Sequence, residues 1–398
     1  MSTRASDGLR LLAVCNYPSE RRPALQVFVR AILRQLTTLG VEVTVLAPES
    51  LWNLAKAATG FGLARRFERQ GGIAVHRPRY LSFSTIALPV GGKTRSWSVN
   101  AHSGAVLREA RRLAGPFDLC MGHFLYPHGF GAAEIGEALG IPAMLSLGES
   151  SFRRYEAAFD HKDIASLLTR FAGVVTNSEP LKEKIQGYGL PTEKIRVFPN
   201  GVNEDLFYPR DRHAARRLCQ LPQERPIVAF VGQFVERKGP SRVLDAIRSR
   251  PEIGAVFLGY GPHLPRGPQV LFQGAVPHEQ VPLWLCAADM LVLPTLDEGC
   301  SNAVLEALFC GLPIVSSDLP FNRAIVDEEV ALLVDPSDVA ALRSAVSTLI
   351  DDPDRRAAMS KAALGRSQHF RLADRAQRML AYLRTLSRRS VLADPPSQ

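Results

Sequence analysis

The sequence predicts an α/β protein of two domains, each with a parallel sheet covered by helices on both faces. The chain has 398 residues, whereas a single hydrophobic core stops growing at roughly 250. Short β-branched apolar runs alternate with longer amphipathic segments, a pattern typical of parallel sheets. The alternation is interrupted once, by Pro199-Asn200-Gly201, Pro209, Pro222 and Pro226. This break indicates two Rossmann-like domains facing each other across a cleft.

Strands are expected at short apolar runs, and helices where apolar residues recur every three or four positions. The expected strands cover residues 9–14, 41–47, 143–147 and 174–176, then 227–232, 255–258, 290–293, 313–316 and 331–334. The expected helices cover residues 28–39 and 181–188, then 240–249, 302–310 and 339–349. We therefore place the first domain at 1–198, a linker at 199–222 and the second domain at 223–369.

Composition excludes several classes of protein. No apolar run approaches the roughly 18 to 20 residues of a membrane span, and residues 1–10 lack the apolar core of a signal peptide. The six cysteines form no Cys-x-x-Cys pair and no metal-ligand spacing. These features predict a cytoplasmic protein.

The net charge of +9 is unevenly distributed along the chain. Residues 1–200 contain 25 Lys+Arg and 16 Asp+Glu, whereas residues 201–398 contain 23 of each. This asymmetry indicates either an anionic partner for the first half, such as phospholipid or a phosphorylated substrate, or an ordinary soluble surface. Nucleic-acid binding is not expected, because no recognisable motif accompanies the charge.

The densest group of candidate functional residues follows the expected strand 290–293. It consists of Glu298, Gly299, Cys300, Ser301, Asn302 and Glu306. Ser301 and Asn302 are N-capping residue types, so a helix is expected to begin there, with free N–H groups that suit a phosphate. Glu306 would lie within reach of a ribose, and Glu298 would face a sugar. Alternatively, Glu306 is a solvated helix residue.

A second group follows the expected strand 227–232 and consists of Gly232, Gln233, Arg237 and Lys238. A strand that ends at Gly232 and continues into a loop with two adjacent cations can place Lys238 or Arg237 against a diphosphate. An Arg-Lys-Gly sequence taken alone is usually surface charge.

In combination, these motifs resemble the donor-binding half of family 4 glycosyltransferases. The matching order and spacing extend over roughly residues 195–350 and include Val231-Gly232-Gln233, Lys238-Gly239, Leu258-Gly259-Tyr260-Gly261-Pro262, and Glu298 and Glu306. Asn200 and Gly201, followed by Phe207-Tyr208-Pro209, look like the interdomain motif of that family. The first half more loosely resembles teichuronic-acid and exopolysaccharide transferases, at Asn16-Tyr17-Pro18, Val27-Phe28-Val29, Phe117-Asp118-Leu119, His123 and Pro127-His128-Gly129.

The resemblance implies the GT-B fold and a retaining transfer from a nucleotide-diphospho-sugar, without a metal ion or other cofactor. Lys238 and the helix that begins near Ser301 would stabilise the leaving diphosphate, Glu298 would hold the sugar and Glu306 the ribose. The acceptor would be a lipid-linked saccharide or a glycan, in cell-surface glycan biosynthesis. The acidic run at residues 351–354 contains the Asp-x-Asp spacing but is interpreted as a solvated turn.

The chain departs from the family pattern at several positions. Leu147-Gly148-Glu149-Ser150 stands where His-Gly-x-Asp is usual, Gln233 where an arginine is common, Pro23-Ala24-Leu25-Gln26 where many members have glycine, and residues 319–323 where Gly-Gly-x-x-Glu is frequent. Glu149 could replace the missing polar contact, or His123 could approach from the neighbouring strand, so both are candidate catalytic residues. Otherwise, a lone histidine at a strand end is structural.

Two functions from other classes remain open. A sugar-nucleotide epimerase of GT-B fold would turn over without an acceptor, and a catalytically silent nucleotide-sugar or glycan-binding protein would bind a donor without transferring the sugar. A nicotinamide dehydrogenase is not expected, because the first strand is followed by Cys15-Asn16-Tyr17-Pro18 and not by Gly-x-Gly-x-x-Gly.

The basic first half contains segments that interleave apolar and cationic residues, as interfacial segments do. They are 51–56 and 61–67, extended by Phe83, Lys93, Arg95 and Trp97. We therefore expect either peripheral binding to an anionic membrane surface or an ordinary insertion packed on the sheet. In the family architecture, residues 370–398 form a helix that returns to the first domain. That arrangement would give the acceptor domain a net charge of +13 and the donor domain, residues 201–369, a net charge of −4.

Overall fold

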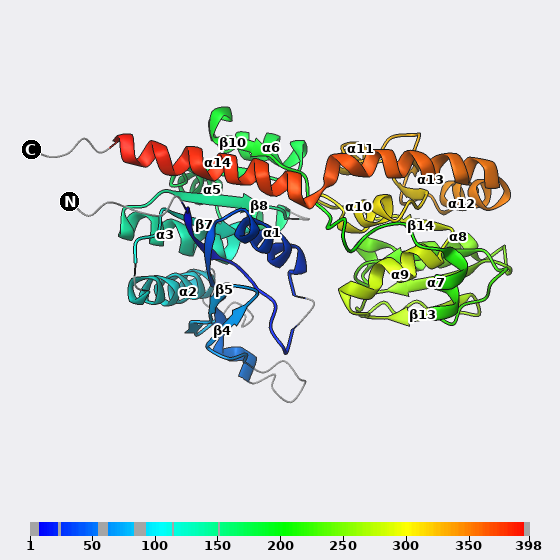
Figure 1. The fold of residues 1–398 in the computed structure, drawn as a ribbon, viewed down its shortest axis with the longest axis horizontal. Coiled ribbons are helices and arrows are strands. Elements are labelled where there is room, and N and C mark those ends of the chain that lie inside the picture. The colour runs from blue at the N-terminus through cyan, green and yellow to red at the C-terminus, as the bar shows by residue number, and fades with distance from the viewer. Residues whose placement is uncertain are drawn as a thin grey trace, which may run out of the picture. The chain divides into compact units, whose positions relative to one another are not determined.

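The computed structural model describes residues 8–22, 25–54, 63–82, 93–113, 115–149 and 152–393. The chain forms two compact units (Figure 1). The first unit consists of Met1–Asn177, Leu181–Phe198 and Arg375–Gln398, and the second of Ser178–Pro180 and Pro199–Asp374. Each unit has its own sheet and its own hydrophobic core.

The sheet of the first unit has the strand order β10-β9-β8-β7-β1-β2-β5-β4, in which only β4 runs antiparallel to its neighbour. These strands are β1 (Arg10–Val14), β2 (Glu42–Leu46), β4 (Phe67–Gln70), β5 (Ile73–His76), β7 (Leu119–His123), β8 (Ala143–Leu147), β9 (Gly173–Thr176) and β10 (Ile195–Val197). A short pair, β3 (Glu49–Ser50) and β6 (Arg79–Tyr80), forms a separate ladder. Strands β7 and β8 are buried along their whole length and are mostly apolar, and their polar residues are His123 and Ser146.

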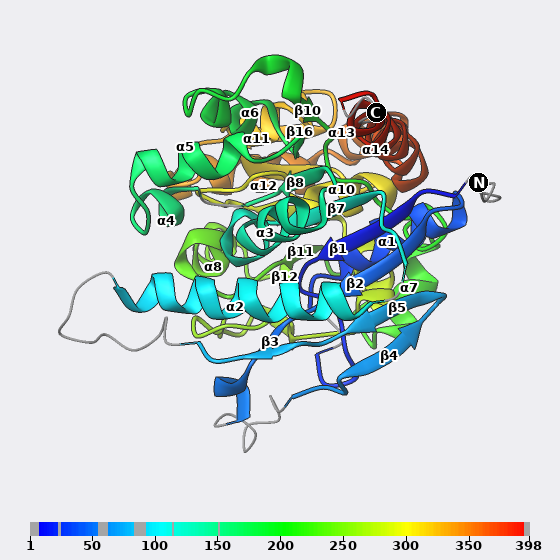
Figure 2. The same cartoon turned by 90° about the vertical axis from the view of Figure 1, so that its left-hand side faces the viewer.

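Helices cover the faces of this first sheet. They are α1 (Val27–Thr38), α2 (Lys93–Arg112), α3 (Phe130–Leu139), α4 (Arg153–Glu156), α5 (His161–Thr169), α6 (Glu179–Gln186) and α14 (Leu372–Ala393), with short turns η1 (Leu51–Leu54), η3 (Leu125–Gly129) and η4 (Thr192–Lys194). Helix α1 buries Val29, Ile32, Leu33 and Leu36, which lie on one face at helical spacing. Helices α2 and α3 lie side by side (Figure 2).

The sheet of the second unit is entirely parallel and has the order β13-β12-β11-β14-β15-β16. Its strands are β11 (Ile227–Val231), β12 (Gly254–Leu258), β13 (Val270–Gly274), β14 (Met290–Leu293), β15 (Ile314–Ser317) and β16 (Ala331–Val334). Counted along this unit, the order is 3-2-1-4-5-6, that of the Rossmann fold. The predicted α/β fold with parallel sheets in two Rossmann-like domains is therefore confirmed.

The helices of the second unit are α7 (Arg212–Leu218), α8 (Pro240–Ile247), α9 (Val281–Ala287), α10 (Asn302–Phe309), α11 (Pro320–Arg323), α12 (Val339–Asp351) and α13 (Pro353–Ser367), with short turns η5 (Glu236–Lys238), η6 (His278–Gln280) and η7 (Gln368–Phe370). Helix α8 has Pro240 at its start, where a missing N–H costs nothing, and buries Val243, Ala246 and Ile247. Each expected strand and helix of the sequence occurs within about two residues of its expected bounds.

Two segments connect the sequence prediction to the division into units. Residues 375–398 belong to the first unit, where Tyr382 on α14 donates a 2.7 Å hydrogen bond to the carbonyl of Lys194 (Figure 1). Residues 199–222, expected as a linker, belong instead to the second unit. Val202, Phe207 and Leu221 are buried in its core, so this segment is held by the packing of its apolar side chains.

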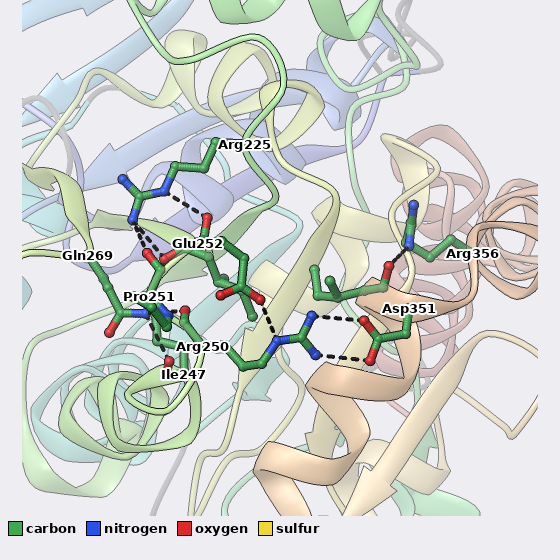
Figure 3. Close-up of polar contacts among 10 residues, drawn as sticks. Arg225, Ile247, Arg250, Pro251, Glu252, Gln269, Asp351 and Arg356 are labelled. Atoms are coloured by element: carbon green, nitrogen blue, oxygen red, sulfur yellow. Dashed lines mark hydrogen bonds and ion pairs between the residues drawn. The ribbon is translucent and has the colours of Figure 1, made fainter.

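Polar contacts fasten the amino edge of the second sheet (Figure 3). Arg225, just before β11, donates hydrogen bonds to the carbonyls of Pro251 and Glu252, each at 2.9 Å. Arg250 makes a two-bond pair with Asp351, at 2.9 and 2.8 Å. The acidic run at residues 351–354, expected as a turn, is instead mostly helical: Asp351 ends α12, Asp352 caps α13 and Asp354 lies in the first turn of α13.

No helix in the described ranges combines the length and the apolar character needed to cross a membrane.

Candidate active site

Lys238 and Glu298 meet at the carboxyl edge of the second sheet. Lys238 ends η5 in the loop after β11, and Glu298 lies in the loop between β14 and α10. Nζ of Lys238 contacts Oε1 of Glu298, and the side chains of Lys238 and Glu298 are 14% and 9% exposed. Strand β11 has β12 on one side and β14 on the other, so the order of the strands reverses direction between β11 and β14. Such a switch point is where open α/β sheets bind their ligands.

Arginine side chains hold these two loops together. Nη1 of Arg237 donates to the carbonyl of Asp297 and lies 3.9 Å from Oε2 of Glu298. In return, the N–H of Leu296 donates to the carbonyl of Arg237 at 2.8 Å. Arg242 donates to the carbonyls of Glu236 and Pro294, at 2.9 and 3.0 Å. Arg237 and Arg242 thus position the loops, whereas Lys238 reaches the carboxylate between them.

The pKa of the Lys238 amine is well below its usual value. Burial and, to a smaller extent, the neighbouring Arg237 cation lower its pKa from 10.5 to about 7, and Asp297 opposes the shift. A second anion placed beside Lys238 would favour the protonated ammonium. The site therefore contains a cation whose charge responds to a ligand.

Glycines allow the loop after β11 to approach the loop after β12. Gly232 donates its N–H to the carbonyl of Leu258 at 2.9 Å, and Phe234 donates to that of Tyr260 at 2.8 Å. A Cβ on Gly259 would lie 1.8 Å from the carbonyl oxygen of Gly232, and the φ of Gly259 is +154°. No other residue fits at that position.

The N-terminus of α10 follows Glu298 closely along the chain. The helix begins at Asn302, and Ser301 precedes it with extended backbone, as the capping pattern predicts. Nδ2 of Asn200 donates to Oδ1 of Asn302 at 2.8 Å and to the carbonyl of Cys300 at 3.4 Å. Asn200 thus anchors the start of α10 within the second unit.

Gly201, the neighbour of Asn200, lies where close packing leaves no room for a side chain. A Cβ there would lie 2.8 Å from the Cα of Leu372. The backbones meet because the N–H of Leu372 donates to the carbonyl of Val202 and the N–H of Val202 donates to the carbonyl of Phe370, each at 2.9 Å. Within the same loops as the ion pair, Gly299 and Cys300 are buried and Gln233 is exposed.

Glu306 has a partner that the sequence did not indicate. Its Oε1 lies 3.0 Å from Nε2 of His278, which follows β13, and the Glu306 side chain is 11% exposed. The ring of Phe207 lies 5.3 Å from that imidazole. Glu306 is thus a positioned carboxylate and not a solvated helix residue. The signal available in the sequence was a histidine just past a strand end.

His123 and Glu149 lie at the carboxyl edge of the first sheet. His123 ends β7 and is buried, and no hydrogen-bond partner for its Nε2 occurs in the described residues. Burial lowers its pKa from 6.5 to about 3, and the charge of Arg375 contributes. His123 is therefore neutral at pH 7.

Glu149 follows β8 and its carboxylate is engaged by the backbone. Oε1 accepts from the N–H of Leu125 at 2.7 Å and from the hydroxyl of Tyr155 at 3.2 Å, and Oε2 accepts from the N–H of Gly148 at 2.9 Å. Burial raises its pKa from 4.5 to about 7, which these hydrogen bonds oppose. Glu149 thus holds the turn after β7 against the turn after β8.

The predicted site residues therefore fall into two groups. Lys238, Glu298, Glu306 and Asn302 are gathered by the second sheet, whereas His123 and Glu149 belong to the first. Sequence reasoning missed His278 and Arg242, and it missed Asn177, the residue after β9. Several residues singled out in the sequence lie outside the described ranges, namely 23–24, 55–62, Phe83 and Ser150.

The fold and this site define a glycosyltransferase of GT-B architecture. Residues 211–366 match the model of glycosyl transferases group 1, and residues 25–206 match that of glycosyltransferase family 4. The chain belongs to this family of enzymes, and the resemblance found in its motifs is confirmed.

Similarity extends to named relatives and solved structures. The chain is 28% identical over 350 residues to TuaC of Bacillus subtilis, which is named for teichuronic acid biosynthesis, covering 83% of this chain and 86% of that protein. It is 30% identical to the D-inositol 3-phosphate glycosyltransferase of Thermobispora bispora, over 52% of this chain and 53% of that one. The fold matches sucrose-phosphate synthase from Thermosynechococcus elongatus with a TM-score of 0.77 at 19% identity, over 95% and 99% of the two chains. It also matches Anabaena HepE in complex with UDP and glucose, with a TM-score of 0.72 at 16% identity over 95% and 100%.

Proposed function

We propose that this glycosyltransferase transfers a sugar from a nucleotide-diphospho-sugar, with retention of anomeric configuration and without a metal ion. One observation carries the proposal: Lys238 and Glu298 meet at the switch point of the second sheet, in the loops that precede α8 and α10. A cation and a helix N-terminus are what a leaving diphosphate requires. The HepE structures contain UDP or UDP-glucose, which supports a donor of this chemical class.

Each residue of the site then has a role. Lys238 donates to the diphosphate as negative charge develops on it, and the N–H groups at the start of α10 add to this stabilisation. Glu298 accepts hydrogen bonds from sugar hydroxyls, and Glu306, oriented by His278, accepts them from the ribose. These groups supply positive charge and orientation from the protein itself, which is why we expect transfer to persist in a chelator.

A panel of nucleotide-sugars tests the donor. Each is added to the purified enzyme and the thermal midpoint is recorded, because a ligand at 100 times its Kd stabilises the fold by about 2.7 kcal/mol. The stabilising donor is then supplied with and without a lipid-linked saccharide, with EDTA present. Acceptor-dependent release of nucleoside diphosphate is expected. Turnover without an acceptor would instead indicate an epimerase, and stabilisation without transfer a silent binding protein.

We further propose that the acceptor is a lipid-linked saccharide or glycan and that the first unit meets an anionic membrane from the cytoplasmic side. The first unit contains 30 Lys+Arg and 16 Asp+Glu, a net +14, whereas the second contains 18 and 23, a net −5. Trp52, Phe67 and Trp97 of the first unit are exposed, at 45%, 50% and 54%. Exposed aromatic residues on a cationic unit suit a headgroup region.

Liposome co-sedimentation tests this membrane proposal. Vesicles with anionic lipid should bind the enzyme at low salt, and neutral vesicles should not. Trp97→Ala should weaken binding, whereas Leu264→Ala, which removes an exposed apolar side chain of the second unit, should not. Equal binding to both vesicle types, or none at low salt, would contradict the proposal.

A further inference from the structure

Asn177 is a buried residue whose side-chain amide makes no hydrogen bond within the described part of the chain. It follows β9 directly and is 2% exposed. Neither its Oδ1 nor its Nδ2 has a hydrogen-bond partner among the residues that the structure describes. An amide carries two donors and a two-lone-pair acceptor, and buried amides are normally paired because their desolvation costs free energy.

The position of Asn177 in the sheet points to a site. Strands β7, β8 and β9 are adjacent and parallel, so their carboxyl ends lie at one edge. That edge carries His123 at the end of β7, Gly148 after β8 and Asn177 after β9. A Cβ on Gly148 would lie 3.3 Å from Nδ2 of Asn177 and 3.7 Å from the ring of Phe124. The amide therefore lies against the Gly148 backbone, close to an aromatic ring.

The polar groups near Asn177 at this edge do not pair with its amide in the described structure. Glu149 follows Gly148 at this edge of the sheet, but its oxygens accept from Leu125, Gly148 and Tyr155. Nε2 of His123, like Asn177, is buried with no partner in the described ranges. The strand ends on either side of β8 thus carry polar atoms, Nε2 of His123 and the amide of Asn177, that have no hydrogen-bond partner among the described residues.

The chemistry of these free groups selects the ligand. The imidazole of His123 is neutral, since burial lowers its pKa to about 3, and the amide of Asn177 carries no charge. A neutral amide both donates and accepts, and so does a hydroxyl, whereas a phosphate only accepts. The aromatic rings of Phe28 and Phe124 lie 5.7 and 4.4 Å from the His123 ring. A saccharide offers hydroxyls and apolar ring faces together.

We propose that Asn177 hydrogen-bonds a saccharide hydroxyl of a substrate and so contributes to substrate selection by the first unit. This inference rests on the proposed glycosyl transfer. The hydroxyl belongs either to the acceptor saccharide or to the sugar of the donor, and the two sources share the same chemistry.

The first arm of the test measures stability without substrate. Asn177→Ala removes an unpaired amide, so its thermal midpoint should stay within about 2 °C of wild type or rise. Asn322→Ala is the matched control, because the buried Asn322 donates from Nδ2 to Oγ of Ser316 at 2.9 Å and to the carbonyl of Ser317 at 2.8 Å. That variant should lose several degrees. A loss in Asn177→Ala equal to that of the control would show a structural residue and overturn the inference.

The second arm measures kinetics with the donor found by thermal shift. If Asn177 binds the acceptor, Asn177→Ala should raise the acceptor KM about 10-fold and leave acceptor-independent donor hydrolysis unchanged. If it binds the donor sugar, hydrolysis and donor KM should change instead. Unchanged kinetics in both measurements would overturn the inference. A wild-type enzyme that transfers no sugar would refute the proposed function, whereas the stability comparison would still decide whether Asn177 is structural.

Discussion

The amino group of Lys238 contacts the carboxylate of Glu298, and both come from loops at the switch point of one parallel sheet. A donor diphosphate must therefore compete with Glu298 for this lysine. When the diphosphate takes the place of Glu298 beside Lys238, the charge of Lys238 becomes available to the leaving group.

Lys238→Ala should chiefly lower kcat, by about 10² to 10³, because the missing cation stabilises negative charge that increases on the diphosphate in the transition state. Donor Kd should change much less. Single-turnover and steady-state kinetics measure both quantities. Lys361→Ala, at an exposed position of α13, is the control and should match wild type. Unchanged turnover in Lys238→Ala would refute the clamp.

Donor binding should be coupled to proton uptake above pH 7. The pKa of Lys238 is lowered to about 7 by burial and by Arg237, so the unliganded amine is mostly neutral at pH 8. A bound diphosphate favours the ammonium, and close to one proton should be taken up. Calorimetry at pH 8 in buffers of different ionisation enthalpy measures this number. At pH 6 the uptake should vanish, and Lys238→Ala should abolish it at pH 8.

Glu306→Ala should raise the donor Kd about 10-fold with little effect on kcat, since a ribose contact is made equally in the ground and transition states. His278→Ala should produce a smaller rise, because it leaves Glu306 in place without the imidazole 3.0 Å away. Equilibrium binding of the cognate nucleoside diphosphate measures both. A larger effect for His278→Ala than for Glu306→Ala would reverse the assigned order.

Gly259→Ala should destabilise the second unit by about 1 to 3 kcal/mol or more, because overpacking usually costs that much. The added Cβ would meet the carbonyl of Gly232 at 1.8 Å. Gly267→Ala is the matched control, because no atom lies within 4 Å of its Cβ position. Thermal unfolding compares the two variants. Equal midpoints would show that the loops separate without cost.

Glu149 should make the enzyme less stable as the pH rises. Its pKa is about 7 in the folded protein against 4.5, so the folded state binds more protons between these values. The stability is fully present below pH 4.5 and is lost as the pH rises through 7, by up to about 3 kcal/mol. Glu149→Gln does not titrate, so its thermal midpoint relative to wild type should be higher at pH 8 than at pH 5.

The exposed Glu137 offers a control of opposite sign for this pH dependence. A hydrogen bond from Arg170 lowers the pKa of Glu137, so its ionised form is the stabilised one. Glu137→Gln should therefore lose rather than gain stability relative to wild type as the pH rises from about 3 to 5, by a small amount, and should change little between pH 5 and 8. The same direction of change in both variants would contradict the assignment at Glu149.

The sequence by itself determined the alternation of strands and helices and the parallel sheets, and it predicted the donor-side residues. These features are local: periodicity selects each element, and Ser301-Asn302 mark a helix start whatever surrounds them. The motif Gly259-Tyr260-Gly261 was recognised as a resemblance, and its reason is the backbone of Gly232, which lies in the neighbouring loop.

Only the tertiary structure decided which side chains are paired and which are free. Glu149 could be read as a substitute catalytic group, yet its oxygens hold the backbone of Leu125 and Gly148. Asn177 gave no signal, because an unpaired amide is visible only once the neighbouring strands are in register. The sequence lists the donors and acceptors, and the physical reason that it cannot pair them is that pairing depends on contacts between distant segments.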